Sequence, residues 1–220
     1  MKTNSDVIIR YTTPAHFEEI RALQSKVYPG IKPWSFEQLE NHLKVFPEGQ
    51  FVADLNGKIV GTSSSFIIMW DEYGPDHNWV DVTGRGTFAT HNPSGKTLYG
   101  AEVCVDPDFR KKGIGQKLYK ARRTLCTRLN LKRIIAAGRL PNYHLHADKM
   151  DPHTYCLKVI WGDIYDPVLR FQLKQGFQFC DIVENYLHGD TESMEFASLI
   201  VWVNPNYNPN FDKKGELNES

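Results

Sequence analysis

The stretch YGAEVCVDPDFRKKGIGQKL, residues 99–118, decides the fold because it combines the patterns of a strand, a loop and the start of a helix. Residues 97–105 are mostly apolar or small, as in a buried strand. Residues 113–129 have the spacing of a helix whose buried face comprises Ile114, Leu118, Ala121, Leu125 and Leu129. A further strand is predicted at 134–137. The segment is therefore predicted to be a strand–loop–helix–strand crossover, which is normally right-handed.

The start of this predicted helix has the features of an anion-binding site. A helix N-terminus offers unpaired N–H groups and a partial positive charge. Gly113 and Gly115 let the backbone approach an anion without obstruction by a Cβ atom, and Arg110, Lys111 and Lys112 add positive charge. The pattern fits a diphosphate. The alternative interpretation of the same residues is a glycine-rich turn with solvated lysines.

The run Val103-Cys104-Val105-Asp106-Pro107, followed by Arg110-x-x-Gly113-x-Gly115, resembles the acetyl-CoA signature of GNAT superfamily N-acetyltransferases, Gln/Arg-x-x-Gly-x-Gly/Ala. The resemblance implies an α/β (α+β) fold with a central mixed, mostly antiparallel twisted sheet flanked by helices, and a β-loop-α-β core that binds acyl-CoA. It implies one domain over residues 1–205 and a polar tail over 206–220. The implied acetyl-CoA segment comprises Val103, Cys104 and Val105 along the pantetheine arm, with Arg110, Lys111, Lys112, Gly113, Ile114, Gly115 and Gln116 around the diphosphate.

A second region of resemblance is VLRFQLKQGF, residues 168–177, which is similar to the late GNAT helix that ends in a glycine and an aromatic residue. Many members have a tyrosine near the end of this helix that protonates the departing thiolate. Gln172 occupies the matching position, and a glutamine amide cannot act as that acid. The remaining interpretations are that Tyr165, Tyr186 or water supplies the proton, or that catalysis is altered.

The resemblance extends further, to the GNAT region that is found fused to nitrilase-type carbon–nitrogen hydrolases. The matching segments are residues 98–105, 138–143 and 166–173. In such fusions the hydrolase follows the GNAT region, whereas this sequence stops at Ser220. A hydrolase activity is therefore not expected of these residues.

In the reaction that the resemblance implies, a neutral amine attacks the thioester carbonyl, so a base for the ammonium is needed. Glu102 is the first candidate, because it lies on the central strand, points opposite Val103 and precedes the implied thioester site. Partial burial would raise its pKa into a useful range. The alternative is a surface or ion-paired strand glutamate.

The long insertion after the crossover strand is where a family member would shape its acceptor pocket. Tyr143, His144 and His146 are the predicted substrate-binding residues. His144, His146 and Asp148 also suggest a metal site, but three ligands in a loop without a fourth at fixed spacing are a weak signal. No metal is predicted.

On both sides of the strand–loop–helix–strand crossover, the sequence predicts further elements. Strands are expected at 7–10, 51–55, 58–70, 177–182 and 196–203. Helices are expected after Thr13-Pro14, after a capping box at 35–38, around 153–160, and from Asp166-Pro167 to Gly176. Asn56-Gly57 predicts a type I′ hairpin turn. Residues 71–96 lack periodicity and are expected to form a long loop.

Composition excludes several classes of protein. Lys plus Arg and Asp plus Glu both number 26 among 220 residues, so no global charge draws the chain onto nucleic acid or an acidic membrane. The apolar runs suit buried strands. The polar N-terminus shows no cleavage-site pattern, and the four cysteines form no CxxC pair. These features predict a cytoplasmic protein with reduced cysteines.

Two other functions have some support in the sequence. Ser94-Gly95-Lys96-Thr97 resembles the end of a P-loop, but Thr90 stands where the first glycine is required and a strand follows instead of a helix. A non-catalytic acyl-CoA-binding or sensing domain is the stronger rival, and Gln172 is its best support. For an enzyme, a small amine is the expected acceptor, and the oligomeric state, including a homodimer, stays open.

Overall fold

The computed structural model describes residues 7–210, and the expected tail beyond 210 lies outside the described residues. Its centre is a seven-stranded sheet in the order β1-β2-β3-β4-β5-β7-β6. All neighbouring strands pair antiparallel except β4 and β5, which are parallel. The strands are β1 (Ile8–Tyr11), β2 (Gln50–Leu55), β3 (Lys58–Ile68), β4 (Thr97–Val105), β5 (Arg133–Arg139), β6 (Gln178–Val183) and β7 (Ala197–Val203).

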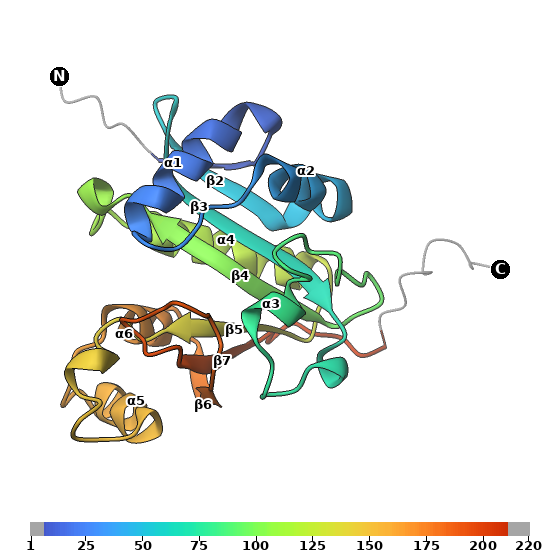
Figure 1. The fold of residues 1–220 in the computed structure, drawn as a ribbon. Coiled ribbons are helices and arrows are strands. Elements are labelled where there is room, and N and C mark those ends of the chain that lie inside the picture. Colours follow the sequence, from blue (N-terminus) through green and yellow to red (C-terminus); the bar gives the residue numbers. More distant parts are fainter. Residues whose placement is uncertain (1–6, 211–220) are drawn as a thin grey trace.

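Helices cover both faces of this sheet (Figure 1). Helices α1 and α2 lie on one face beside β2 and β3, and α4 crosses the opposite face. The α-helices of the described chain are α1 (Phe17–Val27), α2 (Phe36–Val45), α3 (Trp79–Val82), α4 (Ile114–Arg128), α5 (Pro152–Trp161) and α6 (Pro167–Lys174). Short 3-10 helices are η1 (Pro14–His16), η2 (Pro47–Gly49), η3 (Trp70–Glu72), η4 (Pro107–Phe109) and η5 (Tyr143–Leu145).

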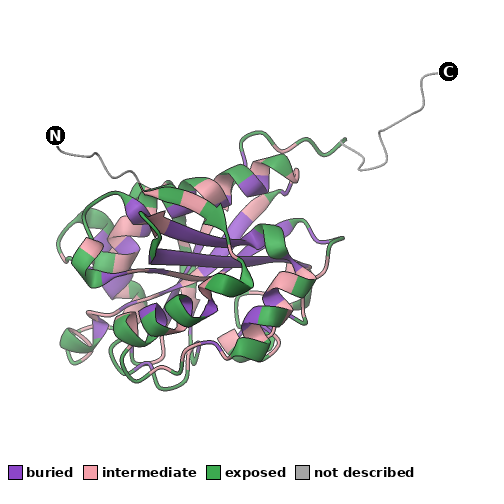
Figure 2. Ribbon diagram, turned by 90° about the horizontal axis from the view of Figure 1, so that it is seen from above, coloured by how far each residue is buried: buried purple, intermediate pink, exposed green. Residues whose placement is uncertain are grey.

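The core is continuous across the sheet, and the central strands are its most buried part (Figure 2). Strand β3 is buried from Ile59 to Ile68, because helices cover it on both faces. Helix α4 turns Ile114, Leu118 and Leu125 toward the sheet, three of the five residues predicted for its buried face. The mixed, mostly antiparallel sheet flanked by helices is the fold class that the sequence predicts.

Local signals in the sequence correspond to the observed turns and caps. Asn56 and Gly57 have φ angles of 54° and 86°, as a type I′ turn between β2 and β3 requires. The capping box at the start of α2 is present, since Ser35 Oγ accepts from Gln38 N–H and Gln38 Oε1 accepts from Ser35 N–H. The hairpin and the second helix are therefore confirmed.

The segment predicted as a long loop, residues 71–96, is more structured than expected. It contains the short helix α3, capped by Asn78, and its backbone bonds to the sheet where Asn92 N–H donates to Ile67 O at 2.8 Å. Phe88 is fully buried and stacks on Phe66. The prediction of irregular structure was incomplete because these interactions are tertiary and leave no periodic signal.

Candidate functional site

Strands β4 and β5 separate partway along their length. Their parallel pairing comprises Thr97 with Arg133, Leu98 with Ile134 and Tyr99 with Ile135, and it ends there. Strand β4 nevertheless continues to Val105 and β5 to Arg139. The two strands therefore form a V that opens toward the carboxyl ends of both (Figure 1). We call this opening the β4–β5 cleft.

The edge of β4 presents backbone polar groups to this cleft. Asp106 N–H donates to Val60 O at 2.9 Å, which makes Asp106 and Val60 a hydrogen-bonded pair of the β3–β4 ladder. Such pairs alternate with non-bonded ones, so the N–H and C=O groups of Val103 and Val105 point away from β3. One of them is engaged, because Tyr28 Oη donates to Val103 O at 2.9 Å. An extended ligand in the cleft would meet this edge.

The N-terminus of α4 lies beyond the end of β4. Its cap, Gly113, has a φ of 77° and no side-chain cap, so the first N–H groups of the helix have no intrahelical or capping partner. Lys111 also takes a left-handed φ of 63°. Arg110, Lys111 and Lys112 are exposed, and the Lys112 ammonium lies 4.8 Å from the centre of the Phe109 ring.

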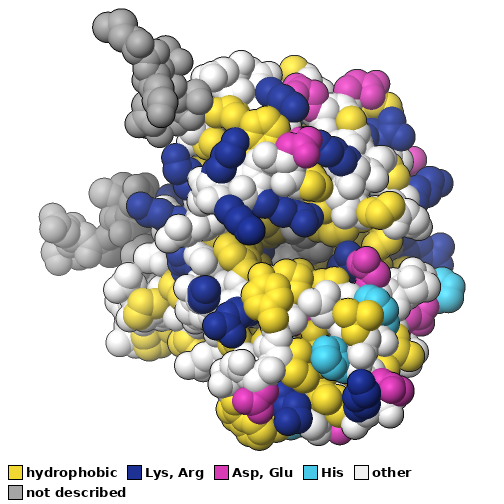
Figure 3. Space-filling model, turned by 90° about the vertical axis from the view of Figure 1, so that its left-hand side faces the viewer, with side chains coloured by type: hydrophobic (Ala, Val, Ile, Leu, Met, Phe, Trp, Pro, Cys, Tyr) yellow, Lys and Arg dark blue, Asp and Glu magenta, His cyan; other side chains and the backbone are white. Residues whose placement is uncertain are grey.

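Figure 3 views the molecule from the end at which β4 and β5 separate. Lys and Arg side chains gather around a hollow, and hydrophobic side chains form its lower border. A positively charged rim next to an apolar wall suits a ligand that has both a polyanionic and a neutral part. The arrangement agrees with an anion site at the start of α4.

Arg122 on α4 occupies the point at which the two strands separate. Its side chain is 1% exposed and donates to Ser65 Oγ, Ser63 Oγ and Glu102 O at 2.8, 2.9 and 2.8 Å. A methyl group added at Gly100 would lie 2.8 Å from Arg122 Nη1, so a larger residue there would displace the guanidinium. Ala101 is the extra residue of a β-bulge against β3. Arg122 thus fixes the bulged part of β4.

The Glu102 carboxylate lies on the other face of the sheet. Thr62 Oγ1 donates to its two oxygens at 2.9 and 3.2 Å. Arg122 contacts Ser63 and Ser65, and alternate strand residues face opposite sides, so Glu102 shares the face of α1 and α2. Burial raises the pKa of Glu102, opposed by hydrogen bonds from Cys104 and Thr62. The side chain is half-buried.

The sequence matches the model of the acetyltransferase (GNAT) family over residues 17–149, which is more than half of the chain. The chain belongs to the GNAT family. The matched region runs from the start of α1 to four residues beyond η5 and includes the β4–β5 cleft and the N-terminus of α4.

Two curated relatives come from Bacillus subtilis (strain 168). The "Uncharacterized N-acetyltransferase YkwB" is 36% identical over 203 residues, which cover 90% of this chain and 89% of the relative. The "Probable hydrolase YhcX" is 45% identical over 208 residues, 94% of this chain. This GNAT chain spans only 40% of the length of YhcX. The second relative therefore has a large region that is not compared with this chain.

Solved structures of low sequence identity share the fold. The loading GNATL domain of CurA from Lyngbya majuscula superposes with a TM-score of 0.80 at 20% identity, covering 90% of this chain and 98% of that one. The GphF GNAT-like decarboxylase in complex with isobutyryl-CoA gives a TM-score of 0.73 at 21% identity, covering 89% and 98%. At these identities the likeness concerns the fold of the GNAT domain.

The two tyrosines suggested as acids lie in different surroundings. Tyr186 is buried, and its hydroxyl lies 2.9 Å from Tyr99 Oη, which in turn lies 2.8 Å from His77 Nε2. Burial raises the pKa of Tyr186 and lowers that of His77. Tyr165 is 64% exposed, and its backbone carbonyl accepts from Asn142 Nδ2. The structure places the hydroxyl of Tyr186 in contact with Tyr99 of β4, whereas Tyr165 has no such contact.

The residues predicted to bind the acceptor are dispersed. Tyr143 is buried edge-on against Tyr155 and Phe196, and its hydroxyl donates to Met150 O at 3.1 Å. His144 is exposed, with Nδ1 3.0 Å from Glu192 O, and His146 is half-buried beside Tyr155. Within residues 7–210 no three His, Cys, Asp or Glu side chains gather as metal ligands would. Apart from Met150, the residues they contact belong to α5 and to the segment that precedes β7.

Sequence reasoning missed three side chains at the cleft. Tyr28 follows α1 and reaches the edge of β4, and the Arg139 guanidinium lies 5.6 Å from the centre of its ring. Arg122 looks like one more basic residue of an amphipathic helix. Helical spacing gave the one indication of its burial. Arg122 lies four residues after Leu118 and therefore shares the buried face of the helix.

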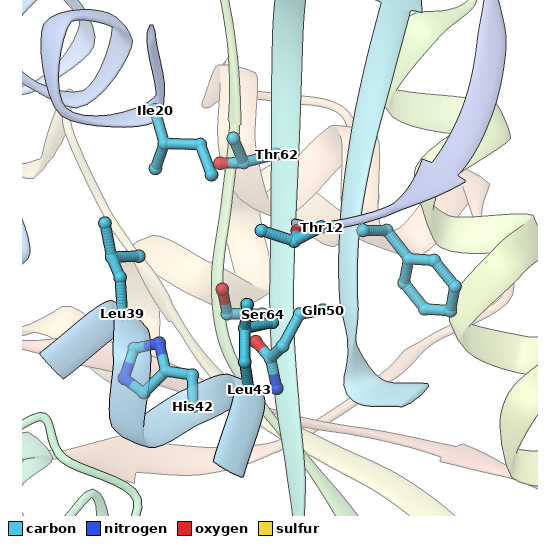
Figure 4. A pocket seen from close by; sticks show the side chains of 9 residues that line it. Thr12, Ile20, Leu39, His42, Leu43, Gln50, Thr62 and Ser64 are labelled. Atoms are coloured by element: carbon cyan, nitrogen blue, oxygen red, sulfur yellow. The ribbon is translucent and has the colours of Figure 1, made fainter. Parts of the chain in front are cut away.

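A small cavity lies on the face of α1 and α2 (Figure 4). Its volume is about 10 Å³, room for about one water molecule, so it is too small to be the acceptor pocket of a GNAT enzyme. His42, Gln50, Thr62 and Ser64 contribute to its lining. Neither His42 Nδ1 nor Gln50 Oε1 has a hydrogen-bond partner among the described residues.

His42 makes the stability of the fold depend on pH. Burial lowers its pKa to about 4, and its Nε2 lies 2.8 Å from Gly86 O. The unfolded chain binds a proton below about pH 6.5, whereas the folded chain does not, so stability is retained above pH 6.5 and falls toward pH 4. We expect this group to lower the free energy of unfolding by about 2 kcal/mol between pH 7 and pH 4.5. Urea unfolding of wild type and His42→Asn at pH 7 and 4.5 measures it. Equal pH dependence in both proteins would contradict the assignment.

No helix within residues 7–210 has the length and apolar character that crossing a bilayer requires.

The described cysteines are free, and Cys104 is buried with its Sγ 3.2 Å from Thr62 Oγ1. Burial raises the pKa of the Cys104 thiol well above its usual range, which makes it a poor nucleophile.

Proposed function

We propose that the chain is an acetyl-CoA-dependent N-acetyltransferase that transfers an acetyl group to the amine of a small acceptor. The observation that supports this most is the β4–β5 cleft, whose open strand edge leads to an uncapped, basic helix N-terminus. An elongated neutral arm and a diphosphate would fit these two parts in that order. The name N-acetyltransferase given to YkwB supports the same activity.

In this proposal the diphosphate lies at the N–H groups of residues 113–116, with Arg110, Lys111 and Lys112 around it. The pantetheine arm lies along Val103 and Val105. The thioester then reaches the part of β4 that precedes Val103, next to the β-bulge at Ala101. Glu102 is beside that place, on the face covered by α1 and α2.

The transfer would proceed by direct attack. The amine nitrogen forms a bond to the acetyl carbonyl carbon, the carbon–sulfur bond breaks, and CoA leaves as the thiolate. Glu102 accepts the ammonium proton, for which its raised pKa is suited. We propose Tyr186 or Tyr165 as the source of the thiolate proton, and Tyr186 is favoured by its contact with Tyr99 on β4. Tyr143, His144 and His146 remain proposed acceptor contacts.

Glu102→Gln tests this mechanism. We expect turnover to fall about 100-fold, because the amide cannot accept the proton, while the Kd of acetyl-CoA changes less than about two-fold. Thiol release from acetyl-CoA, followed with a chromogenic thiol reagent and a panel of small amines, measures turnover, and calorimetry measures Kd. Wild-type turnover should also rise with pH through the raised pKa of Glu102. Unchanged turnover in the variant would refute Glu102 as the base.

A non-catalytic acyl-CoA-binding or sensing domain is the second candidate, and Gln172 is the observation that favours it. Tight binding of acetyl-CoA by the wild type without thiol release for any amine would support the sensor. The activity of YhcX as a whole is not proposed for this chain, which spans 40% of that relative.

A further inference from the structure

The side chain of Gln172 is buried with one end of its amide unpaired. It projects from α6, is 5% exposed, and its Nε2 donates to Tyr119 Oη at 3.3 Å. Its Oε1 has no hydrogen-bond partner among the described residues. An unpaired buried polar atom destabilises a fold, so such atoms usually have a partner that is protein, water or ligand.

One atom of the Gln172 amide lacks a partner in either of the two possible orientations of the amide. If the oxygen and nitrogen are exchanged, Oε1 accepts from the Tyr119 hydroxyl and Nε2 is left without a partner. In one orientation the missing partner is a donor, and in the other it is an acceptor. A ligand amide offers both, because it has an N–H and a C=O group.

The amide lies against the β5 side of the β4–β5 cleft. A methyl group added at Gly138 would be 2.3 Å from Gln172 Oε1, so the amide rests directly on the backbone there. Gly138 is three residues beyond Ile135, the last β5 residue paired with β4. Tyr119 belongs to α4, which faces the cleft from the same side as Gln172. The amide therefore lies against the part of β5 that no longer pairs with β4.

We propose that Gln172 binds a secondary amide of the pantetheine arm of CoA. The assignment rests on the proposed function, because it requires CoA to occupy the β4–β5 cleft. The arm is neutral and contains two secondary amides, which match a neutral buried amide without introducing an unpaired charge. Gln172 then acts as a cofactor-positioning residue, and the proton for the thiolate comes from another group.

The test compares two probes that differ by the pantetheine arm. CoA and 3′-phospho-ADP share the adenine, ribose and phosphates, and only CoA has the arm. Calorimetric Kd values are measured for wild type, Gln172→Leu and the control Gln178→Leu, an exposed glutamine at the start of β6. We expect Gln172→Leu to weaken CoA roughly ten-fold, because a ligand amide loses its partner, while 3′-phospho-ADP binding stays unchanged. Gln178→Leu should alter neither.

The outcomes separate this inference from the proposed function. Wild type that fails to bind CoA would refute the proposed function itself. Wild type that binds CoA, with Gln172→Leu equal to wild type or equally weakened for both probes, would overturn the role of Gln172 alone.

The melting temperature of each variant shows whether a loss of affinity comes from a failure to fold. Gln172→Leu also removes the partner of the buried Tyr119 hydroxyl, so a lower melting temperature is expected whether or not Gln172 binds CoA, and the Kd for CoA relative to that for 3′-phospho-ADP is the deciding readout. If Gln172→Leu is insoluble, Gln172→Met keeps the chain length and removes the amide, and the same loss of CoA affinity is expected. A lower melting temperature together with unchanged CoA affinity would contradict the proposal.

Discussion

Arg122→Leu is expected to lower the free energy of unfolding by about 3 kcal/mol or more. The guanidinium is buried and donates to Ser63 Oγ, Ser65 Oγ and the carbonyl of Glu102. Leucine fills much of the volume but leaves these acceptors unpaired at the centre of the sheet. Because the bulged part of β4 loses its support, acetyl-CoA affinity should fall as well. Urea unfolding at pH 7 measures the stability.

The next residue provides a matched control. Arg123 is half-buried on the same helix and has one hydrogen bond, from Nη1 to Gln175 O at 3.0 Å. Arg123→Leu should lower the free energy of unfolding by about 1 kcal/mol. Arg122→Lys keeps the charge and loses the planar fork, so an intermediate loss is expected. If Arg122→Leu lowers the free energy of unfolding no more than Arg123→Leu does, the buried guanidinium does not support the sheet.

The second large effect concerns the basic loop before α4. Lys111→Glu combined with Lys112→Glu is expected to weaken acetyl-CoA roughly 100-fold at low salt, because two attractive charges near the diphosphate become repulsive. The exposure of both side chains predicts little effect on stability. Calorimetric titration at two salt concentrations measures the Kd and its salt dependence.

The charge-matched control reverses two lysines away from this loop. Lys120 and Lys132 are exposed, and Lys120→Glu with Lys132→Glu changes the net charge by the same amount. We expect less than about a three-fold change in Kd at physiological salt, where the Debye length is about 8 Å and charges away from the loop are screened. Equal weakening in the two double variants would mean that net charge, and not the loop, governs binding.

Much of the fold was predictable because it depends on local patterns. The strand at 97–105 coincides with β4, and the helix expected at 113–129 is α4 within one residue at each end. Asn56-Gly57 and the capping box at Ser35 act through their own backbone, so their effects are visible in sequence. The parallel β4–β5 pair follows from the strand–helix–strand order, because a helical crossover returns the chain in the same direction.

The only part of the candidate site that could be predicted from the sequence is the part whose residues belong to one continuous segment. The anion loop is continuous in sequence, whereas the cleft depends on where two strands stop pairing, which no local pattern encodes. Tyr28 meets Val103 across 75 positions, and Gln172 meets Tyr119 across 53. The departure at Gln172 was visible in the sequence, but its unpaired amide and its contact with Gly138 needed the packing of α6 on β5.

A crystal structure of the chain with CoA tests the central claim most directly. We predict that the diphosphate accepts hydrogen bonds from the backbone N–H groups of residues 113–116, and that the pantetheine arm lies between β4 and β5 along Val103 and Val105. The sulfur should lie near Glu102, on the side of the β-bulge at Ala101. CoA bound outside the β4–β5 cleft, or a cleft that stays empty at saturating CoA, would contradict the account.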